Sequence, residues 1–164
     1  TKNYARSIML GMGLPRGQAE KNTMVRLGRQ SVLTRVKPIN YIAVIGEQAI
    51  RYPAVSREIM IEQLCHLLST AEYPNVTIQV LPLGGYRYTP ALEGRFILLE
   101  FVRDSSVVQV DSYWSTSTIT NDKAVKSYRD AAEVVCRDAL GGHDSKKLIV
   151  QVLKDMEKVM NDVN

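Results

Sequence analysis

Glu47 is the acidic residue whose position most favours chemistry. It directly follows the apolar run Tyr41–Ile45, which has the residue types of a strand buried on both faces. A carboxylate beside a core is costly to bury unless it has a partner. Arg26 and Arg29 are candidate partners, and so is Arg51, which lies one turn away if a short helix follows. Glu47 therefore either forms an ion pair that holds the fold or offers a carboxylate to a ligand.

A second group of polar side chains lies around His66. Cys65 and His66 are neighbours, but adjacent helical positions point about 100° apart, so they cannot act together on one reacting atom. We expect Cys65 to be a buried, inert thiol. Gln63 and His66 lie one turn apart and can share a polar face. His66 is then either a ligand-binding group or an ordinary histidine at the edge of the core.

Aromatic residues in expected loops and strand ends form a third group, Tyr86, Tyr88, Tyr113 and Trp114. Such side chains either line a ligand pocket or close over the core. Glu100 and Asp111 interrupt otherwise apolar strands, so each either faces solvent in ordinary alternation or points to a polar cavity.

The common catalytic and metal-binding signatures are missing from the sequence. Gly84 and Gly85 lead into tyrosines rather than into a phosphate-binding loop and helix, and there is no Gly-x-Ser-x-Gly elbow. Two cysteines and two histidines without a Cys-x-x-Cys pair do not make a zinc site. We therefore expect no metal and no cofactor.

The elements that must position these side chains follow from apolar periodicity. Helical spacing predicts helices near residues 4–12, 15–35, 56–72, 122–140 and 145–160. The apolar stripes of the third and fourth of these helices include Met60, Leu64, Val125 and Tyr128, and the expected N-caps of the last two are Asn121 or Asp122 and Asp144 or Ser145. Runs of β-type residues predict strands at 41–45, 76–80, 95–102 and 107–111, with 112–120 either an edge strand or a loop. The 95–111 hairpin is the clearest strand signal. We expect an α+β fold, a largely antiparallel sheet of about four to five strands packed with about five helices.

Length, composition and charge narrow the class of protein. The 164 residues are 45% hydrophobic and 23% charged, which predicts one globular domain over residues 1–164. The longest apolar run, Tyr41–Ile45, is too short to cross a bilayer, and two cysteines favour reduced thiols in the cytoplasm. The net charge of +4 arises chiefly between Arg16 and Lys37, where Glu20 is the single acid. We expect this segment to pair internally or to meet a partner rather than to bind DNA alone.

Several segments, in order, resemble one protein family. They are Thr1–Arg6, Arg26–Gln30, Glu47–Arg51, Gln63–Leu67 and the string Asn-Val-Thr-Ile-Gln-Val-Leu-Pro at 75–82. The chain is similar to the C-terminal domain of actinobacterial Xre/Cro-type helix-turn-helix, toxin–antitoxin-like regulators, a domain of unknown function. The resemblance implies a sensory domain that binds a small molecule or a small partner protein and touches DNA only through a helix-turn-helix domain preceding Thr1. It implies no catalytic residues.

Three hypotheses about function follow. In the first, this is the regulatory domain, and its ligand site is assembled from Arg29, Glu47, Gln63, His66, Tyr86, Tyr88 and Trp114. In the second, a stand-alone biosynthetic enzyme, a cofactor-free cyclase or isomerase, reuses the regulator fold with one acid or base in an apolar pocket. In the third, the chain is a docking or homodimerisation module whose contact is the apolar helix Leu148–Met160.

Overall fold

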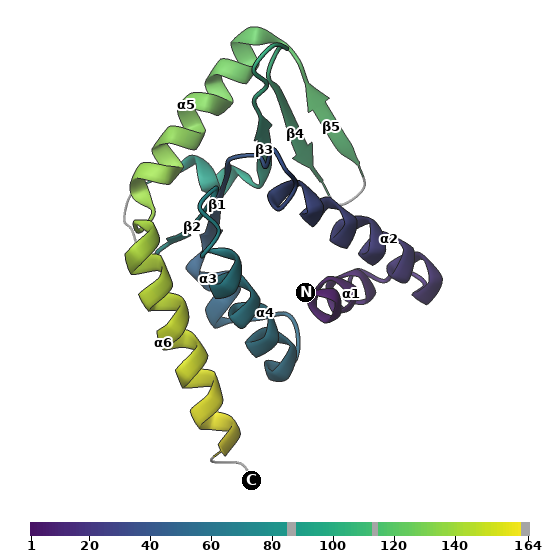
Figure 1. Cartoon of the computed structure of the whole chain (residues 1–164), viewed down its shortest axis with the longest axis vertical. Coiled ribbons are helices and arrows are strands. Elements are labelled where there is room, and N and C mark those ends of the chain that lie inside the picture. The colour runs from purple at the N-terminus through teal and green to yellow at the C-terminus, as the bar shows by residue number, and fades with distance from the viewer. Residues whose placement is uncertain (85–87, 113–114, 162–164) are drawn as a thin grey trace. The chain divides into compact units, whose positions relative to one another are not determined.

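The chain forms two compact units. The computed structural model describes residues 1–84, 88–112 and 115–161. Unit 1 joins Thr1–Leu83 to the segment that begins at Leu140, and unit 2 is Gly84–Ala139. The described elements are six α-helices, two short 3-10 helices and five strands, so the predicted α+β class is confirmed (Figure 1).

Unit 1 is built around two parallel strands and the helices that connect and cover them. Its elements are α1 (Lys2–Gly11), α2 (Arg16–Gly28), η1 (Arg29–Leu33), β1 (Tyr41–Gly46), α3 (Glu47–Arg51), α4 (Arg57–Thr70), β2 (Val76–Leu81) and α6 (Gly142–Asn161). β1 and β2 pair in parallel from Tyr41 opposite Val76 to Gly46 opposite Leu81. Figure 1 shows α6 running beside α4, and both helices belong to the packing of this unit.

The predicted single, largely antiparallel sheet is therefore wrong. The described strands form a two-stranded parallel sheet and a separate three-stranded antiparallel sheet. The physical reason is the connection between β1 and β2, which contains α3 and α4, because a helical crossover returns the chain in the same direction. β1 is also not buried on both faces, since Tyr41 and Ile42 are 42% and 61% exposed.

The core of unit 1 is aliphatic and continuous. Its buried members come from α3, α4, β2 and α6: Ile50, Met60, Leu64, Val76, Ile78, Val80, Ile149 and Val152. The predicted apolar stripe of α4 is confirmed at Met60 and Leu64, which are buried. Cys65 is exposed, which corrects our expectation of a buried thiol. It follows Leu64 by about 100° around the helix and so turns away from the core.

Two polar residues hold the edges of β2 in place. The Asn75 side-chain amide donates to the carbonyl oxygens of Leu33 (3.1 Å) and Ile39 (2.8 Å), which fixes the approach to β1. Ser145 is fully buried; its hydroxyl accepts from the Val80 amide at 2.9 Å and donates to the Leu140 carbonyl at 3.0 Å. Asp144 and Ser145, the two expected N-caps, both lie inside α6 rather than capping it, because the helix already begins at Gly142.

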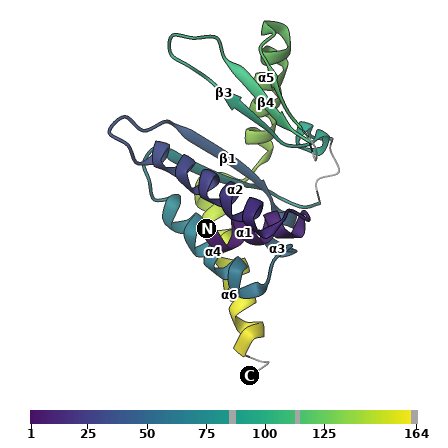
Figure 2. The same ribbon diagram turned by 90° about the vertical axis from the view of Figure 1, so that its right-hand side faces the viewer.

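Unit 2 is an antiparallel meander covered by one helix. Its elements are η2 (Pro90–Glu93), β3 (Phe96–Leu99), β4 (Val107–Asp111), β5 (Thr116–Ile119) and α5 (Asp122–Asp138). The predicted hairpin is confirmed by the β3–β4 pairing, and β5 is the edge strand that we weighed against a loop. Figure 2 shows α5 lying against this sheet, where Val108, Val125 and Val135 are buried.

The long predicted helix over 15–35 ends earlier than expected. α2 stops at Gly28 and continues as the 3-10 helix η1. None of the described helices combines the length and the hydropathy that a membrane span requires.

Candidate functional site

An open groove in unit 2 is the candidate ligand site. Its volume is about 310 Å³, at the lower end of the range of about 300–1,000 Å³ that is usual for small-molecule sites. η2, β3, β4 and α5 all contribute to its wall. The side chains with functional chemistry in this wall are Glu93, Arg95, Phe96, Ser127 and Tyr128.

Phe96 and Tyr128 form the aromatic part of the groove. Their ring centroids are 5.1 Å apart with an interplanar angle of 61°, an edge-to-face pair. Tyr128 belongs to the apolar stripe of α5, one turn after the buried Val125, while Phe96 begins β3. The contact therefore joins helix to sheet and leaves ring surface for a flat apolar ligand.

Glu93 and Arg95 place opposite charges beside these rings. Gly94, between them, has a φ of +120°, a conformation that L side chains rarely adopt, so glycine is needed for the chain to turn from η2 into β3. The Tyr88 hydroxyl donates to Glu93 Oε1 at 2.7 Å, and this bond to a carboxylate raises the pKa of Tyr88. Tyr88 thus reaches the groove through Glu93, while its own ring is largely exposed.

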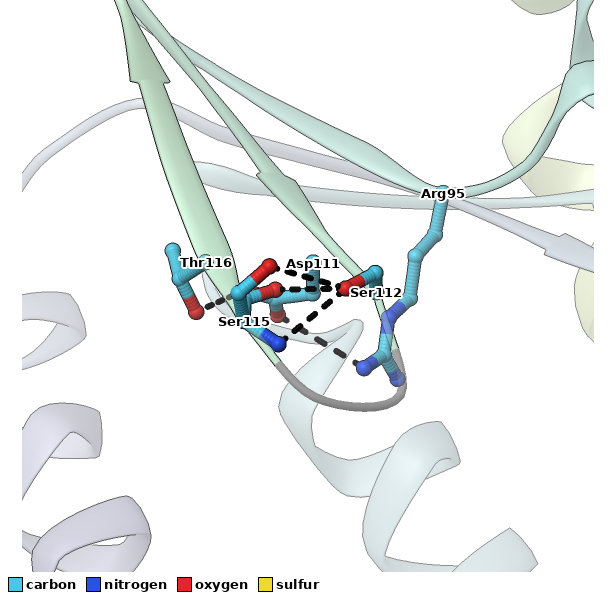
Figure 3. A network of polar contacts seen from close by, with 5 residues as sticks. All are labelled: Arg95, Asp111, Ser112, Ser115 and Thr116. Atoms are coloured by element: carbon cyan, nitrogen blue, oxygen red, sulfur yellow. Dashed lines mark hydrogen bonds and ion pairs between the residues drawn. The ribbon is translucent and has the colours of Figure 1, made fainter.

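Arg95 remains largely free to meet a ligand. Its Nη2 lies 3.7 Å from Asp111 Oδ2, a long contact, and 65% of its side chain is exposed. Asp111 is held in turn by the Thr116 hydroxyl, which donates to its Oδ1 at 2.7 Å (Figure 3). Within the described part of the chain Asp111 is the ion-pair partner of Arg95, and so long a contact leaves most of the N–H donors of the guanidinium available for an anionic ligand.

Hydrogen bonds between Ser112 and Ser115 close the β4–β5 connection. The Ser112 amide donates to the Ser115 carbonyl at 2.8 Å, and the Ser112 hydroxyl accepts from the Ser115 amide at 3.1 Å (Figure 3). Trp114 and Tyr113 lie in this connection but outside the described residues, as does Tyr86. The sequence-predicted roles of Tyr86 and Trp114 stay predictions.

Glu47 lies in unit 1, where both of its carboxylate oxygens accept hydrogen bonds from the protein. Its Oε1 accepts from Arg51 Nε at 2.5 Å, and its Oε2 accepts from the Leu83 amide at 2.8 Å. The Leu83 amide, and then Arg51, lower the pKa of Glu47 against the opposing effect of burial. Of the three expected partners, Arg51 on the short helix α3 is the one that pairs. A carboxylate with both oxygens engaged and a lowered pKa is a poor general base.

Gln63 and His66 lie on α4, where α1 packs. Gln63 Oε1 accepts from the Thr1 nitrogen at 2.6 Å, and the neighbouring Glu62 accepts from the Asn3 amide at 2.9 Å. Burial, assisted by the Thr1 amino group, lowers the pKa of His66 against the opposing charge of Glu62. This half-buried imidazole is therefore neutral at neutral pH.

The described members of the sequence-predicted set come from several elements and from both units. Arg29 is exposed in η1, Glu47 lies at the carboxyl end of β1, and Gln63 and His66 share α4. Tyr88 alone among them lies next to the groove, through Glu93. No hydrogen bond or ion pair found in the described chain joins any two members of the set, and their common ligand stays a prediction.

Sequence reasoning missed the residues that line the groove. Phe96 and Tyr128 were assigned to a strand and a helical stripe, where aromatic side chains are ordinarily core. The triplet Glu93-Gly94-Arg95, opposite charges around a glycine at a strand start, was the one available signal. Among the described residues, no cluster of three His, Cys, Asp or Glu side chains could hold a metal ion.

Comparison with known proteins places the chain in a family. No curated protein and no solved structure matches it. A model of the family described as "Domain of unknown function (DUF5753)" matches residues 1–151, which is nearly the whole chain. The chain therefore belongs to the DUF5753 family.

Proposed function

We propose that this chain is the ligand-binding regulatory domain of a helix-turn-helix transcription regulator, acting in the cytoplasm, and that the groove of unit 2 binds the ligand. The observation that carries the proposal is the meeting of an exposed arginine, a carboxylate and two aromatic rings around one groove. DNA would be contacted through a separate helix-turn-helix domain, as the resemblance implies.

The chemistry of the groove favours an aromatic anion. Phe96 and Tyr128 offer apolar surface, and Arg95 offers N–H donors to a carboxylate or a similar group. The Glu93 carboxylate already accepts a hydrogen bond from Tyr88, so it is less available to bind a cationic group of a ligand. Arg95 is more available to bind an anionic group. A ligand regulates only by binding two conformations with different affinity, and the long Arg95–Asp111 contact is one that ligand binding can replace.

Three fragments of equal ring size test the site: benzoate, benzylamine and benzyl alcohol. For molecules of this size we expect benzoate to bind with a Kd of about 1 mM and the other two more weakly. The amide NMR signals of Phe96, Val110 and Tyr128 and the methyl signals of Val110 should shift with benzoate. Arg95→Gln should weaken benzoate at least about fivefold, whereas Arg103→Gln, in the exposed β3–β4 connection, should not change it.

Two results would overturn the site. If benzyl alcohol and benzoate bound equally well, Arg95 would not be the group that recognises the anion. If the NMR shifts were confined to residues outside the groove, the groove would not be the ligand site. The regulatory part is tested separately by reading the gene upstream of Thr1. A helix-turn-helix coding segment there supports the proposal, and a start codon directly before Thr1 contradicts it. Among the described residues, no arrangement of acid or base gives comparable support to the enzymatic alternative.

A further inference from the structure

Positive charge is concentrated in one segment of unit 1. Residues 16–37 carry six basic residues and one acidic residue, while the rest of the chain carries 15 basic and 16 acidic residues. The single acid, Glu20, pairs with Arg6 of α1. The segment therefore keeps an excess of positive charge that the remainder of the chain does not balance.

The structure leaves these cations in solvent. The six are Arg16, Lys21, Arg26, Arg29, Arg35 and Lys37, and all are exposed. None forms an ion pair in the described part of the chain. Internal ion pairing of these six cations, the first of our two expectations, is thus not found among the described residues, and we therefore pursue the second, an external partner.

Apolar side chains are exposed between these charges. α2 buries Ala19 and Thr23, so the opposite face of the helix points outward. Met24 and Val25 on the outer side are 57% and 52% exposed. We call the exposed side chains of Lys21, Met24, Val25, Arg26 and Arg29 the basic–apolar surface. Methionine and arginine are enriched in protein interfaces, and these five side chains are exposed among the described residues.

We propose that the basic–apolar surface is a docking site for an acidic protein segment that carries apolar side chains. Carboxylates of the partner would meet Lys21, Arg26 and Arg29, and its apolar residues would cover Met24 and Val25. Removing an exposed methionine and valine from water stabilises a complex only when the partner also offers apolar atoms. The basic–apolar surface shares no residue with the groove, because its residues all belong to unit 1 and those of the groove to unit 2.

The composition of the surface favours a protein partner over nucleic acid. DNA binds through phosphates, which leave Met24 and Val25 without apolar contact. Residues 16–37 contain no aromatic side chain on which bases could stack. Nucleic acid is therefore the competing outcome of the test.

The test uses the whole chain and three fluorescein-labelled probes. The first is a synthetic peptide of about 16 residues that alternates pairs of glutamate and leucine along a helix. The second has the same charge with serine in place of leucine, and the third is a DNA duplex of random sequence. Fluorescence anisotropy measures each affinity at about 50 mM and about 300 mM salt.

The Glu/Leu peptide should bind at least about tenfold more tightly than the Glu/Ser peptide, because the apolar contacts add to the charge pairs. The double substitution Lys21→Glu with Arg29→Glu should weaken binding of the Glu/Leu peptide about tenfold or more. Met24→Ser with Val25→Ser should weaken it about fivefold and leave the Glu/Ser peptide unchanged. Lys123→Glu with Lys154→Glu, exposed cations elsewhere, is the matched control and should change binding less than twofold.

Circular dichroism of every variant separates lost binding from lost fold. Equal binding of the two peptides would overturn the proposal, since the apolar part would then contribute nothing. Tighter binding of the duplex than of the Glu/Leu peptide would assign the surface to nucleic acid instead. Failure of the Glu/Leu peptide to bind would also overturn it, while benzoate binding at the groove would be unaffected.

Discussion

The two units differ in how their best-placed polar side chains are used. In unit 1 two polar residues next to the core are engaged by the fold: Ser145 is fully buried between Val80 and Leu140, and both oxygens of Glu47 accept hydrogen bonds. In unit 2 the ion pairs lie at the surface, as the exposures of Arg95 and Arg129 show. A polar group already satisfied by the fold has little left for a ligand, so the ligand site is more reasonably sought in unit 2.

The largest effect is expected from the core of unit 1. Leu64→Ala should lower the free energy of unfolding by about 3 kcal/mol, because Leu64 is fully buried in a continuous aliphatic cluster. Urea unfolding followed by circular dichroism measures it. Leu92→Ala, at a side chain that is 71% exposed in unit 2, is the control and should cost less than about 0.5 kcal/mol.

The same experiment tests the single-domain prediction. Few hydrophobic side chains of unit 2 are buried, Val108 and Val125 among them, so we expect both units to unfold in one transition. Fluorescence of Trp114, within the sequence span of unit 2, should then follow the same curve as circular dichroism. Two separate midpoints would show instead that the units are independent domains.

Glu47→Gln should remove about 2 kcal/mol at pH 7, because the amide replaces a charged acceptor of two hydrogen bonds. The pKa of Glu47 is lowered in the fold, so its contribution is complete above its ordinary pKa of 4.5 and is lost as pH falls through the lowered value. The difference between wild type and variant should therefore shrink at acidic pH. Glu133→Gln, exposed on α5, is the control; a pH-independent difference would contradict the assignment.

Ser145→Ala tests the hydrogen bond that joins α6 to β2, in which the Ser145 hydroxyl accepts from the Val80 amide. The Val80 amide, on a fully buried residue, would lose its hydroxyl acceptor, and we expect a cost of about 1–2 kcal/mol. Hydrogen exchange at the Val80 amide should quicken by more than exchange at Ile78. Unchanged exchange at Val80 would mean that the hydroxyl is not its partner in solution.

The smallest effect is expected from Arg129→Ala in unit 2. Arg129 Nε lies 2.8 Å from Glu100 Oε1, but the two side chains are 39% and 58% exposed. Solvent-exposed ion pairs contribute about 0–1 kcal/mol, so the melting temperature should barely move, and less in high salt than in low salt. If Arg129→Ala lowered the free energy of unfolding as much as Glu47→Gln, the exposed ion pair of unit 2 would matter as much as the buried carboxylate of unit 1. The contrast between the two units would then be wrong.

Local patterns were predictable where one element decides them. The stripe of α4, the cap and extent of α5 and the β3–β4 hairpin follow from periodicity and turn residues. The pairing of Glu47 with Arg51 was foreseen as one of three candidate ion pairs, because i, i+4 spacing is a property of the chain itself. Cys65 was misassigned because a composition that is apolar on average does not say which helical face meets the core.

The sequence by itself therefore determined the α+β class, most of the helices and the unbalanced charge of residues 16–37. Only the tertiary structure decided the parallel pairing of β1 with β2, since strand direction depends on how the intervening helices pack. It also decided which tyrosine meets Phe96 and which carboxylates are consumed by the fold. Such contacts join residues 30 or more positions apart, and no local spacing encodes them.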